Sequence, residues 1–235
     1  MPTGLTGTRS IVVATTNPHK VAEIQAIFAS RGLADVRLLT LSEVRGFPFK
    51  EPEEIGVTCE ENARVKALAY AAATGLACLA DDSGIEIDAL EGRPGVISSH
   101  YFSDGRTDGA AASMSREQRD AANNARVMRE LEGVARERRG ARFVCMMVLA
   151  AAGRDRDVPR VRCTARGTFE GRIGLSNQVP RGANGFGYDP LFLVAPEFER
   201  TSAELSPDEK NARSHRAHAA GQIASWLGAN AATLA

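Results

Sequence analysis

One continuous apolar run, residues 143–151, limits the possible fold more than any other feature of this chain. A run of this length without polar positions predicts a strand at the centre of a sheet. The shorter apolar run at residues 11–14 is bounded by polar residues and predicts another buried strand. Predicted strands and helices interleave, but some strands follow one another directly. This order favours an α/β fold with a mixed β-sheet flanked by helices over a purely parallel sheet.

The length and charge of the chain set the next limits. A chain of 235 residues suits one large α/β domain or two small lobes that share a core. Lys plus Arg and Asp plus Glu both number 29, so the formal net charge is zero. We therefore expect no long-range attraction to nucleic acid or to a membrane surface, and any phosphate must be bound by a local site.

The four cysteines carry no metal-binding or redox motif, because no two of them are spaced as C-x-x-C. We expect free thiols, in keeping with a reducing compartment. The first ten residues lack the apolar stretch of a signal peptide, and no run of about 18 apolar residues predicts a membrane-spanning helix. The expected location is the cytoplasm.

Helix starts are marked by capping residues, and helix ends by glycine or a second cap. The expected caps are Asn17 before Pro18, Thr58 with Glu61, Ser115 with Gln118, and Ser206 before Pro207. Gly75 is the expected stop of the second helix. A break near Arg213, with Ser214 capping a new helix, would let Lys210 and His215 face one ligand. Residues 36–57 are expected to be irregular, and residues 1–10 and 229–235 to be flexible ends.

Two segments could bind phosphate and metal. The first joins the strand at 11–14 to a helix start, where free N–H groups, hydroxyls and a lysine attract anions; its residues are Thr15, Thr16, Asn17, Pro18, His19 and Lys20. The second is a loop, Asp81-Asp82-Ser83-Gly84, whose paired carboxylates offer the oxygen ligands that Mg²⁺ prefers. Taken alone, each is also explained by an ordinary capped helix or an ordinary polar turn.

Three further segments carry polar groups. Glu53 and Glu54 precede a helix on which Asn62 and Lys66 share a face, which is also compatible with a solvated charged surface. Phe186, between two glycines, could stack on a planar base, and Asp189 could accept hydrogen bonds from it. The last set, Lys210 with Ser214, His215 and Arg216, could equally be a polar helix face.

Together these segments resemble the inosine triphosphate pyrophosphatase family, also called XTP/dITP diphosphatases, from Ile11 to Leu227. Each motif is weak alone, but their order and spacing are specific. The matching motifs are Thr15 to Lys20, Glu61-Asn62-Ala63 with Lys66-Ala67, Ala80 to Gly84, Gly92-Arg93-Pro94-Gly95, Phe186 to Pro190, and Ser206 to Lys210 with Ser214-His215-Arg216.

The resemblance implies a single nucleotide pyrophosphatase domain over residues 1–235, with a long mixed sheet in two lobes and an active-site cleft between them. It also implies a homodimer that requires Mg²⁺. The implied reaction cleaves the α–β phosphate bond of ITP, dITP or XTP, and releases the monophosphate and pyrophosphate.

Residue roles carried over by position begin with Asp82 as proton acceptor and metal-site residue, and with Glu53 as the second metal-site carboxylate, although Glu54 is an open alternative. Lys20 and Lys66 would stabilise phosphate charge, which makes them catalytic with Asp82. Substrate contacts would come from Thr15 through Lys20, Ser83, Phe186, Gly187, Tyr188, Asp189, Lys210, His215 and Arg216.

Two positions depart from the family pattern. Thr16 stands where the family usually has Gly, and Cys59 where it usually has an aromatic residue. Two other functions stay open at this point. One is a non-catalytic purine nucleotide sensor, and the other is a pyrophosphatase for other modified nucleotides, such as modified pyrimidines.

Overall fold

The computed structural model describes residues 9–15, 18–33, 36–151 and 158–230. Its strands form a six-stranded sheet in the order β2-β1-β3-β4-β5-β6. The strands are β1 (Arg9–Val13), β2 (Val36–Thr40), β3 (Ala77–Ile87), β4 (Gly140–Ala151), β5 (Arg160–Ile173) and β6 (Phe192–Val194). Strand β1 pairs in parallel with β2 and β3, whereas β5 pairs with β6 antiparallel. The predicted mixed sheet of an α/β fold is therefore confirmed.

Six α-helices and six short 3-10 helices lie in the described part of the chain. The α-helices are α1 (Pro18–Ser30), α2 (Cys59–Thr74), α3 (Ala110–Ser113), α4 (Arg116–Glu130), α5 (Pro207–Arg213) and α6 (His215–Ala229). The 3-10 helices are η1 (Leu41–Glu43), η2 (Asp88–Leu90), η3 (Gly95–Ser103), η4 (Arg136–Arg138), η5 (Asp189–Leu191) and η6 (Ser202–Glu204). In the described segments, no helix is long and apolar enough to cross a membrane.

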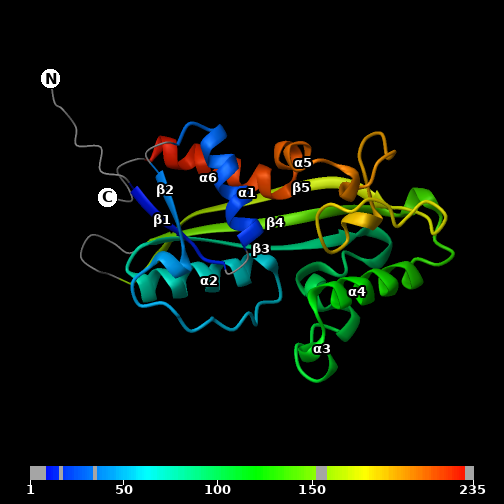
Figure 1. Ribbon diagram of the computed structural model, residues 1–235, viewed down its shortest axis with the longest axis horizontal. Coiled ribbons are helices and arrows are strands. Elements are labelled where there is room, and N and C mark those ends of the chain that lie inside the picture. The colour runs from blue at the N-terminus through cyan, green and yellow to red at the C-terminus, as the bar shows by residue number, and fades with distance from the viewer. Residues whose placement is uncertain (1–8, 16–17, 34–35, 152–157, 231–235) are drawn as a thin grey trace. The chain divides into compact units, whose positions relative to one another are not determined.

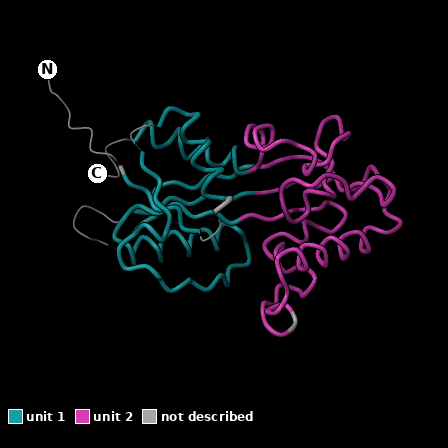
Figure 2. The backbone as a smooth tube through the Cα atoms, viewed as in Figure 1, with its two compact units in different colours: residues 1–82, 145–167, 216–235 teal, residues 83–144, 168–215 magenta. Residues whose placement is uncertain are grey.

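Two compact units divide the chain (Figure 2). Unit 1 comprises residues 1–82, 145–167 and 216–235, and unit 2 comprises residues 83–144 and 168–215. Strands β3, β4 and β5 each contribute residues to both units. The four cysteines are free thiols, as expected from their spacing.

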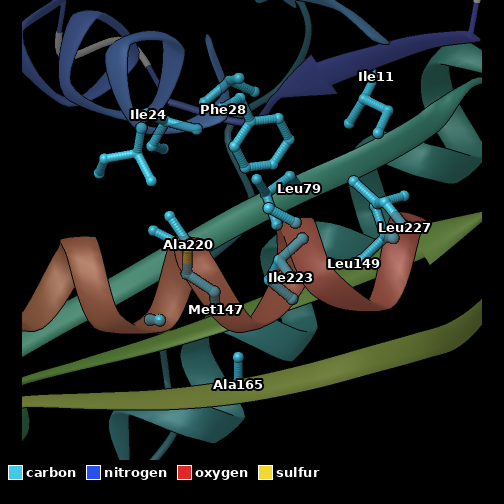
Figure 3. Close-up of a cluster of buried hydrophobic side chains, with 14 of the residues drawn as sticks. Ile11, Ile24, Phe28, Leu79, Met147, Leu149, Ala165, Ala220, Ile223 and Leu227 are labelled. Atoms are coloured by element: carbon cyan, nitrogen blue, oxygen red, sulfur yellow. The ribbon is translucent and has the colours of Figure 1, made fainter. Parts of the chain in front are cut away.

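The core of unit 1 follows from the alternation of side chains along each strand. Ile11, Leu79 and Met147 pack with α1 and α6 on one face of the sheet (Figure 3). Their sequence neighbours Val12, Cys78 and Met146 pack with α2 on the other face. Figure 1 shows α1 and α6 on one side of these strands and α2 on the opposite side. Both faces of the sheet in unit 1 are thus buried, which explains why its strands have continuous apolar sequences.

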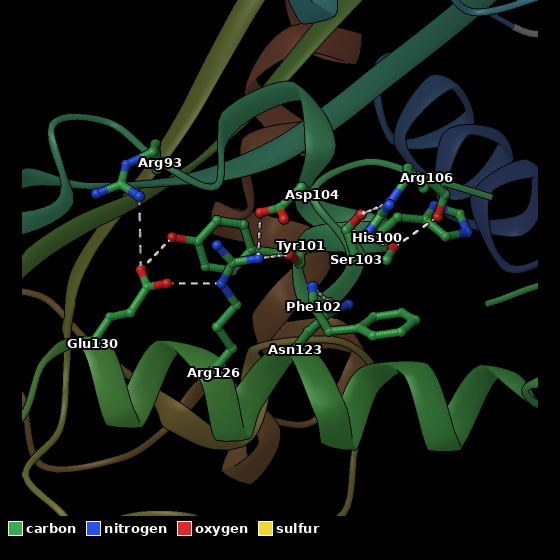
Figure 4. Close-up of polar contacts among 10 residues, drawn as sticks. All are labelled: Arg93, His100, Tyr101, Phe102, Ser103, Asp104, Arg106, Asn123, Arg126 and Glu130. Carbon is green, nitrogen blue, oxygen red and sulfur yellow. Dashed lines mark hydrogen bonds and ion pairs between the residues drawn. The ribbon is translucent and has the colours of Figure 1, made fainter. Parts of the chain in front are cut away.

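Unit 2 has its own core, built on the second half of β3, on β5 and β6, and on α4. Its polar contacts tie η3 to α4 (Figure 4). Tyr101 in η3 donates a hydrogen bond from Oη to Glu130 of α4 at 2.5 Å. Arg126 of α4 pairs with Glu130 and with Asp104, both at 2.7 Å. These bonds fix the position of η3 against one face of α4.

Most of the expected caps are present. The Oγ1 of Thr58 accepts a hydrogen bond from the N–H of Glu61, and Gly75 ends α2 with φ at 68°. Capping boxes begin α4 at Ser115 and α5 at Ser206. Helix α1 begins at Pro18 as predicted, although Asn17 lies outside the described residues. The predicted break is confirmed, because α5 ends at Arg213 and α6 begins at His215.

The predicted loop at Asp81-Asp82-Ser83-Gly84 is wrong, because β3 runs without interruption through all four residues. Gly84 is not a turn residue there. A Cβ atom at Gly84 would lie 2.1 Å from the carbonyl oxygen of Gly95 and 2.7 Å from Oγ of Ser98. Glycine is therefore required for the close approach of η3 to the strand.

Two other expectations change. Residues 36–57 are not wholly irregular, since they hold β2 and η1. The ends expected to be flexible contribute to regular structure at their inner edges, because Arg9 and Ser10 belong to β1 and Ala229 is the last residue of α6. The rest of these ends, residues 1–8 and 231–235, lies outside the described residues.

Candidate active site

Strand β3 carries the two adjacent carboxylates, Asp81 and Asp82, to opposite faces of the sheet in unit 1. Successive side chains in a strand alternate, so Asp81 follows Leu79 toward α1 and α6, and Asp82 follows Ala80 toward α2. Each aspartate therefore contacts a different set of basic residues. Asp81 and Asp82 are the same type of residue, but their chemistry differs because their side chains point to opposite faces of the sheet.

Asp81 is a buried anion held by two cations. Its Oδ2 lies 3.0 Å from Nζ of Lys20 in α1 and 3.3 Å from Nη2 of Arg216 in α6. Glu23 completes the group, 2.5 Å from Nη1 of Arg216. Burial alone would raise the pKa of Asp81, but Lys20 and Arg216 outweigh it and hold that pKa well below its ordinary value. Asp81 thus stays ionised and joins α1, β3 and α6.

Asp82 has a different environment on the α2 side. Lys66 of α2 places Nζ 3.6 Å from Oδ1 of Asp82 and 3.3 Å from Oε2 of Glu54. Burial raises the pKa of Asp82 above its ordinary value, Lys66 opposes this, and Glu54 adds to it. A carboxylate with a raised pKa is a better proton acceptor, so Asp82 fits the role of general base.

Lys66 stays protonated despite its burial. Burial would lower its pKa, but the carboxylates of Asp82 and Glu54 raise it above the ordinary lysine value. The ammonium group of Lys66 therefore supplies a full positive charge between two carboxylates. Such a charge can stabilise the anion of a phosphate group.

Glu53 and Glu54, the alternative metal-site carboxylates, differ in their contacts. Both glutamates are exposed, but Glu54 shares Lys66 with Asp82 and acts on the pKa of Asp82, whereas Glu53 has no contact of this kind in the described structure. Of the two glutamates, Glu54 is therefore the one that interacts electrostatically with Asp82.

These residues fit a hard divalent cation. Oδ2 of Asp82 is buried and has no hydrogen-bond partner among the described residues. The described residues contain no group of three or more His, Cys, Asp or Glu side chains placed to hold a metal. Mg²⁺ does not need such a cage, since it is usually held by one or two carboxylates together with water and substrate phosphates.

The predicted phosphate-binding segment is described only in part. Thr15 follows β1, with its N–H bonded to the carbonyl of Val13 at 2.9 Å. Lys20 lies in the first turns of α1 and pairs with Asp81. Thr16 and Asn17 lie outside the described residues, and so do the side chains of Pro18 and His19.

The predicted base-binding residues lie in unit 2, except Arg216, which belongs to unit 1. Oδ2 of Asp189 accepts a hydrogen bond from the N–H of Phe186 at 2.9 Å and pairs with Nζ of Lys210 at 2.6 Å. The same ammonium lies 5.5 Å from the centre of the Phe186 ring. Asp189, Lys210 and Phe186 are thus brought together, as the sequence predicted. They offer an acceptor, a donor and an aromatic face.

Other predicted contact residues have partners of their own. Tyr188 is buried and donates from Oη to the carbonyl of Ser98 at 2.7 Å. His215 stacks on Phe143, with ring centres 5.2 Å apart. Arg216 belongs to unit 1, where it pairs with Asp81 and Glu23, and Ser83 follows Asp82 in β3. Their proposed contacts with substrate stay predictions.

Sequence reasoning missed several residues that support these groups. Glu23 completes the set around Asp81, and three residues of α4 contact the segment that carries Phe186: Arg116, Asp120 and Asn124. Their spacing in α4 marks one helix face. Nothing in the sequence says which loop that face contacts.

Comparison with known proteins supports the resemblance drawn from the motifs. The model of the Ham1 family matches residues 11–226. A dITP/XTP pyrophosphatase of Nitratidesulfovibrio vulgaris is 47% identical over 210 residues, covering 89% of this chain and 91% of the relative. A dITP/XTP pyrophosphatase of Nocardia farcinica is 43% identical over 209 residues, covering 89% and 90%.

Solved structures agree with these sequence relatives. A HAM1 protein from Coxiella burnetii superposes with a TM-score of 0.75 and 38% identity, covering 94% of this chain and 99% of the other. The Staphylococcus aureus Ham1 protein gives a TM-score of 0.74 and 32% identity over the same shares. The motif order, the fold and the close relatives lead to one conclusion: the chain belongs to the Ham1 family.

Proposed function

We propose that this protein hydrolyses non-standard purine nucleoside triphosphates (ITP, dITP and XTP) to the monophosphate and pyrophosphate. The observation that carries the proposal is Asp82, a half-buried carboxylate that lies next to Lys66, shares it with Glu54 and has a raised pKa. Relatives that are 40–47% identical to the chain bear the name dITP/XTP pyrophosphatase, which supports the substrate class.

The proposed chemistry in unit 1 is attack by water on the α-phosphorus. Asp82 takes the proton from the attacking water, the bond between the α-phosphorus and its bridging oxygen breaks, and pyrophosphate leaves. Lys66 and Lys20 stabilise negative charge on the phosphates. Asp82 and Glu54 would hold Mg²⁺, which when bound neutralises phosphate charge and orients the leaving group.

The proposed base recognition uses groups in unit 2. Asp189 and Lys210 offer an acceptor and a donor beside the ring of Phe186. A 6-keto purine presents an acceptor at position 6, which suits the ammonium of Lys210. Adenine presents an amino donor there, which cannot accept a hydrogen bond from the ammonium of Lys210, and a mismatch of this kind is a strong source of discrimination.

One substrate panel tests the proposal. Purified protein with Mg²⁺ is assayed for pyrophosphate release from ITP, XTP, ATP, GTP and modified pyrimidine triphosphates. We expect ITP and XTP to be turned over far faster than ATP and GTP. Equal rates on all four purines would contradict the proposal. Binding of ITP without turnover would favour a nucleotide sensor, and preferential turnover of the pyrimidines a different pyrophosphatase.

Assembly and location belong to the same proposal. We propose a homodimer that acts on the nucleotide pool of the cytoplasm, as the family resemblance implies. Sedimentation velocity over a range of protein concentrations measures the assembly. A monomer at micromolar concentration would contradict the dimer.

A further inference from the structure

Helix α4 presents three side chains, four residues apart, to the segment that carries Phe186. The guanidinium carbon of Arg116 lies 4.3 Å from the centre of the Phe186 ring. Oδ2 of Asp120 accepts a hydrogen bond from the N–H of Gly187 at 2.9 Å. Nδ2 of Asn124 donates to the carbonyl of Gly187 at 3.1 Å. Residues spaced in this way lie on one face of a helix, so α4 contacts this segment over successive turns.

The two hydrogen bonds hold both polar groups of a single residue. Gly187 has a φ of 64°, which is a left-handed conformation that few other residues adopt readily. On the other side of the ring-bearing residue, Asp189 holds the N–H of Phe186. The backbone around Phe186 is therefore anchored before any ligand arrives. Anchoring of this kind lowers the entropy cost of binding, because less of the site must be ordered.

We propose that Asp120 and Asn124 are positioning residues for base recognition, and that they act by holding the two peptide groups that flank Gly187 in the conformation that the base requires. The proposal rests on the function proposed above and extends it to α4. Neither residue needs to touch the substrate. Both act on its affinity through the ring of Phe186 and the carboxylate of Asp189.

The neighbouring residue, Asn123, offers a matched control. It has the same side chain and is buried in the same helix, but it faces η3. Its Oδ1 accepts from the N–H of Phe102 at 2.8 Å (Figure 4), and its Nδ2 donates to the carbonyls of Ser98 and Ser99 at 3.2 Å. The Asn123→Ala variant therefore measures how much stability is lost when α4 is loosened from η3 and not from the segment that carries Phe186.

The experiment compares five variants in the full-length chain: Asn124→Ala, Asn124→Asp, Asp120→Ala, Asp120→Asn and Asn123→Ala. Each is measured for KM and kcat with ITP and for thermal unfolding. Inhibition by inosine monophosphate, which has a base, is compared with inhibition by inorganic pyrophosphate, which has none. Asn124→Asp keeps the size of the side chain and removes the donor, so it serves if Asn124→Ala fails to fold.

We expect both Asn124 variants and Asp120→Ala to raise the KM for ITP about three- to ten-fold, the range that one net hydrogen bond supports. Inhibition by inosine monophosphate should weaken by a similar factor, whereas inhibition by pyrophosphate and kcat should change less than about two-fold. Asp120→Asn keeps an acceptor for the N–H of Gly187 and should restore the wild-type KM. Asn123→Ala should lower the unfolding temperature without changing KM.

Two outcomes overturn the proposal. One is an unchanged KM for ITP in folded Asn124→Asp and Asp120→Ala. The other is an equal loss of inhibition by inosine monophosphate and by pyrophosphate, which would indicate a general structural effect. If the wild-type protein releases no pyrophosphate from ITP, the proposed function itself fails. That result is read from the wild type alone.

Discussion

Asp81 and Asp82 are chemically identical neighbours, yet the protein shifts their pKa values in opposite directions. The balance at Asp81 favours the charged form, because Lys20 and Arg216 both contact it and outweigh its burial. At Asp82 burial and Glu54 outweigh Lys66, so the neutral form gains. When the environments of two carboxyl groups shift their pKa values apart in this way, one group can serve a structural role and the other can transfer a proton.

A matched pair of variants separates these roles. Asp81→Asn should lower the free energy of unfolding by about 3–5 kcal/mol, because it leaves buried cations without their anion. Asp82→Asn should change that free energy by less than about 1 kcal/mol and reduce turnover about 10²- to 10⁴-fold. Urea unfolding and a pyrophosphate-release assay measure the two effects. Near wild-type turnover in Asp82→Asn would remove that residue from the mechanism.

The pH dependence of the same pair has a definite sign. The folded-state pKa of Asp81 lies below its value of 3.8 in the unfolded chain. Its contribution to stability is therefore complete above about pH 4 and is lost as the pH falls below that value. The stability difference between wild type and Asp81→Asn should shrink under acid conditions. A difference that grows with acid would contradict the assignment.

The two neighbouring glutamates give a second residue-scale prediction. Glu54→Gln should raise the Mg²⁺ concentration needed for half-maximal activity by about ten-fold, because it removes one carboxylate from the proposed metal site. Glu53→Gln, at the neighbouring position that does not contact Lys66, should leave that concentration unchanged within about two-fold. Titration of chelator-treated protein with Mg²⁺ measures both. The reverse ranking would return the metal role to Glu53.

At the scale of elements, β3 depends on a glycine for its contact with η3. Gly84→Ala should destabilise the protein by about 1–3 kcal/mol, since the added Cβ meets the carbonyl of Gly95 at 2.1 Å. Gly228→Ala in α6 is the control, because a Cβ added at that position would meet nothing within 4 Å among the described residues. Urea unfolding of the two variants measures the difference. Equal stability of both would show that η3 moves aside without cost.

The sequence predicted those elements whose signals are local. The caps at Thr58, Ser115 and Ser206 are set by residues a few positions away, so pattern reading finds them. The continuity of β3 through Asp81 was missed, because Arg216, which compensates that buried charge, lies 135 positions along the chain. A local rule assigns Asp-Asp-Ser-Gly to a turn, whereas distant charges make the strand possible.

The candidate site divides in the same way. Phe186, Asp189 and Lys210 were predicted together because family motifs mark them, and the structure places them in contact. Asp120 and Asn124 were not predicted, since their partner Gly187 lies 67 and 63 positions away and neither belongs to a motif. Contacts between a helix face and a distant loop need a structure.

At the scale of the whole molecule, the numbers of acidic and basic residues are equal, so the formal net charge is zero. A chain of zero formal charge has no net long-range attraction to a polyanion. We expect no measurable binding of duplex DNA at about 0.15 M salt, whereas ITP should bind, because its phosphates meet a local cluster. Fluorescence anisotropy with labelled DNA tests this. Micromolar binding would contradict a purely small-molecule partner.

The alternation of side chains along β3 has a consequence for how this chain can vary. An insertion of one residue in the strand ahead of Asp81 would exchange the faces of the two aspartates without changing a single side chain. The face on which each aspartate lies thus depends on whether its position in the strand is odd or even, and not on its residue type. Insertions and deletions can therefore be tolerated in the loops of such a protein. In β3 an insertion changes the face on which each aspartate lies, whereas a substitution does not.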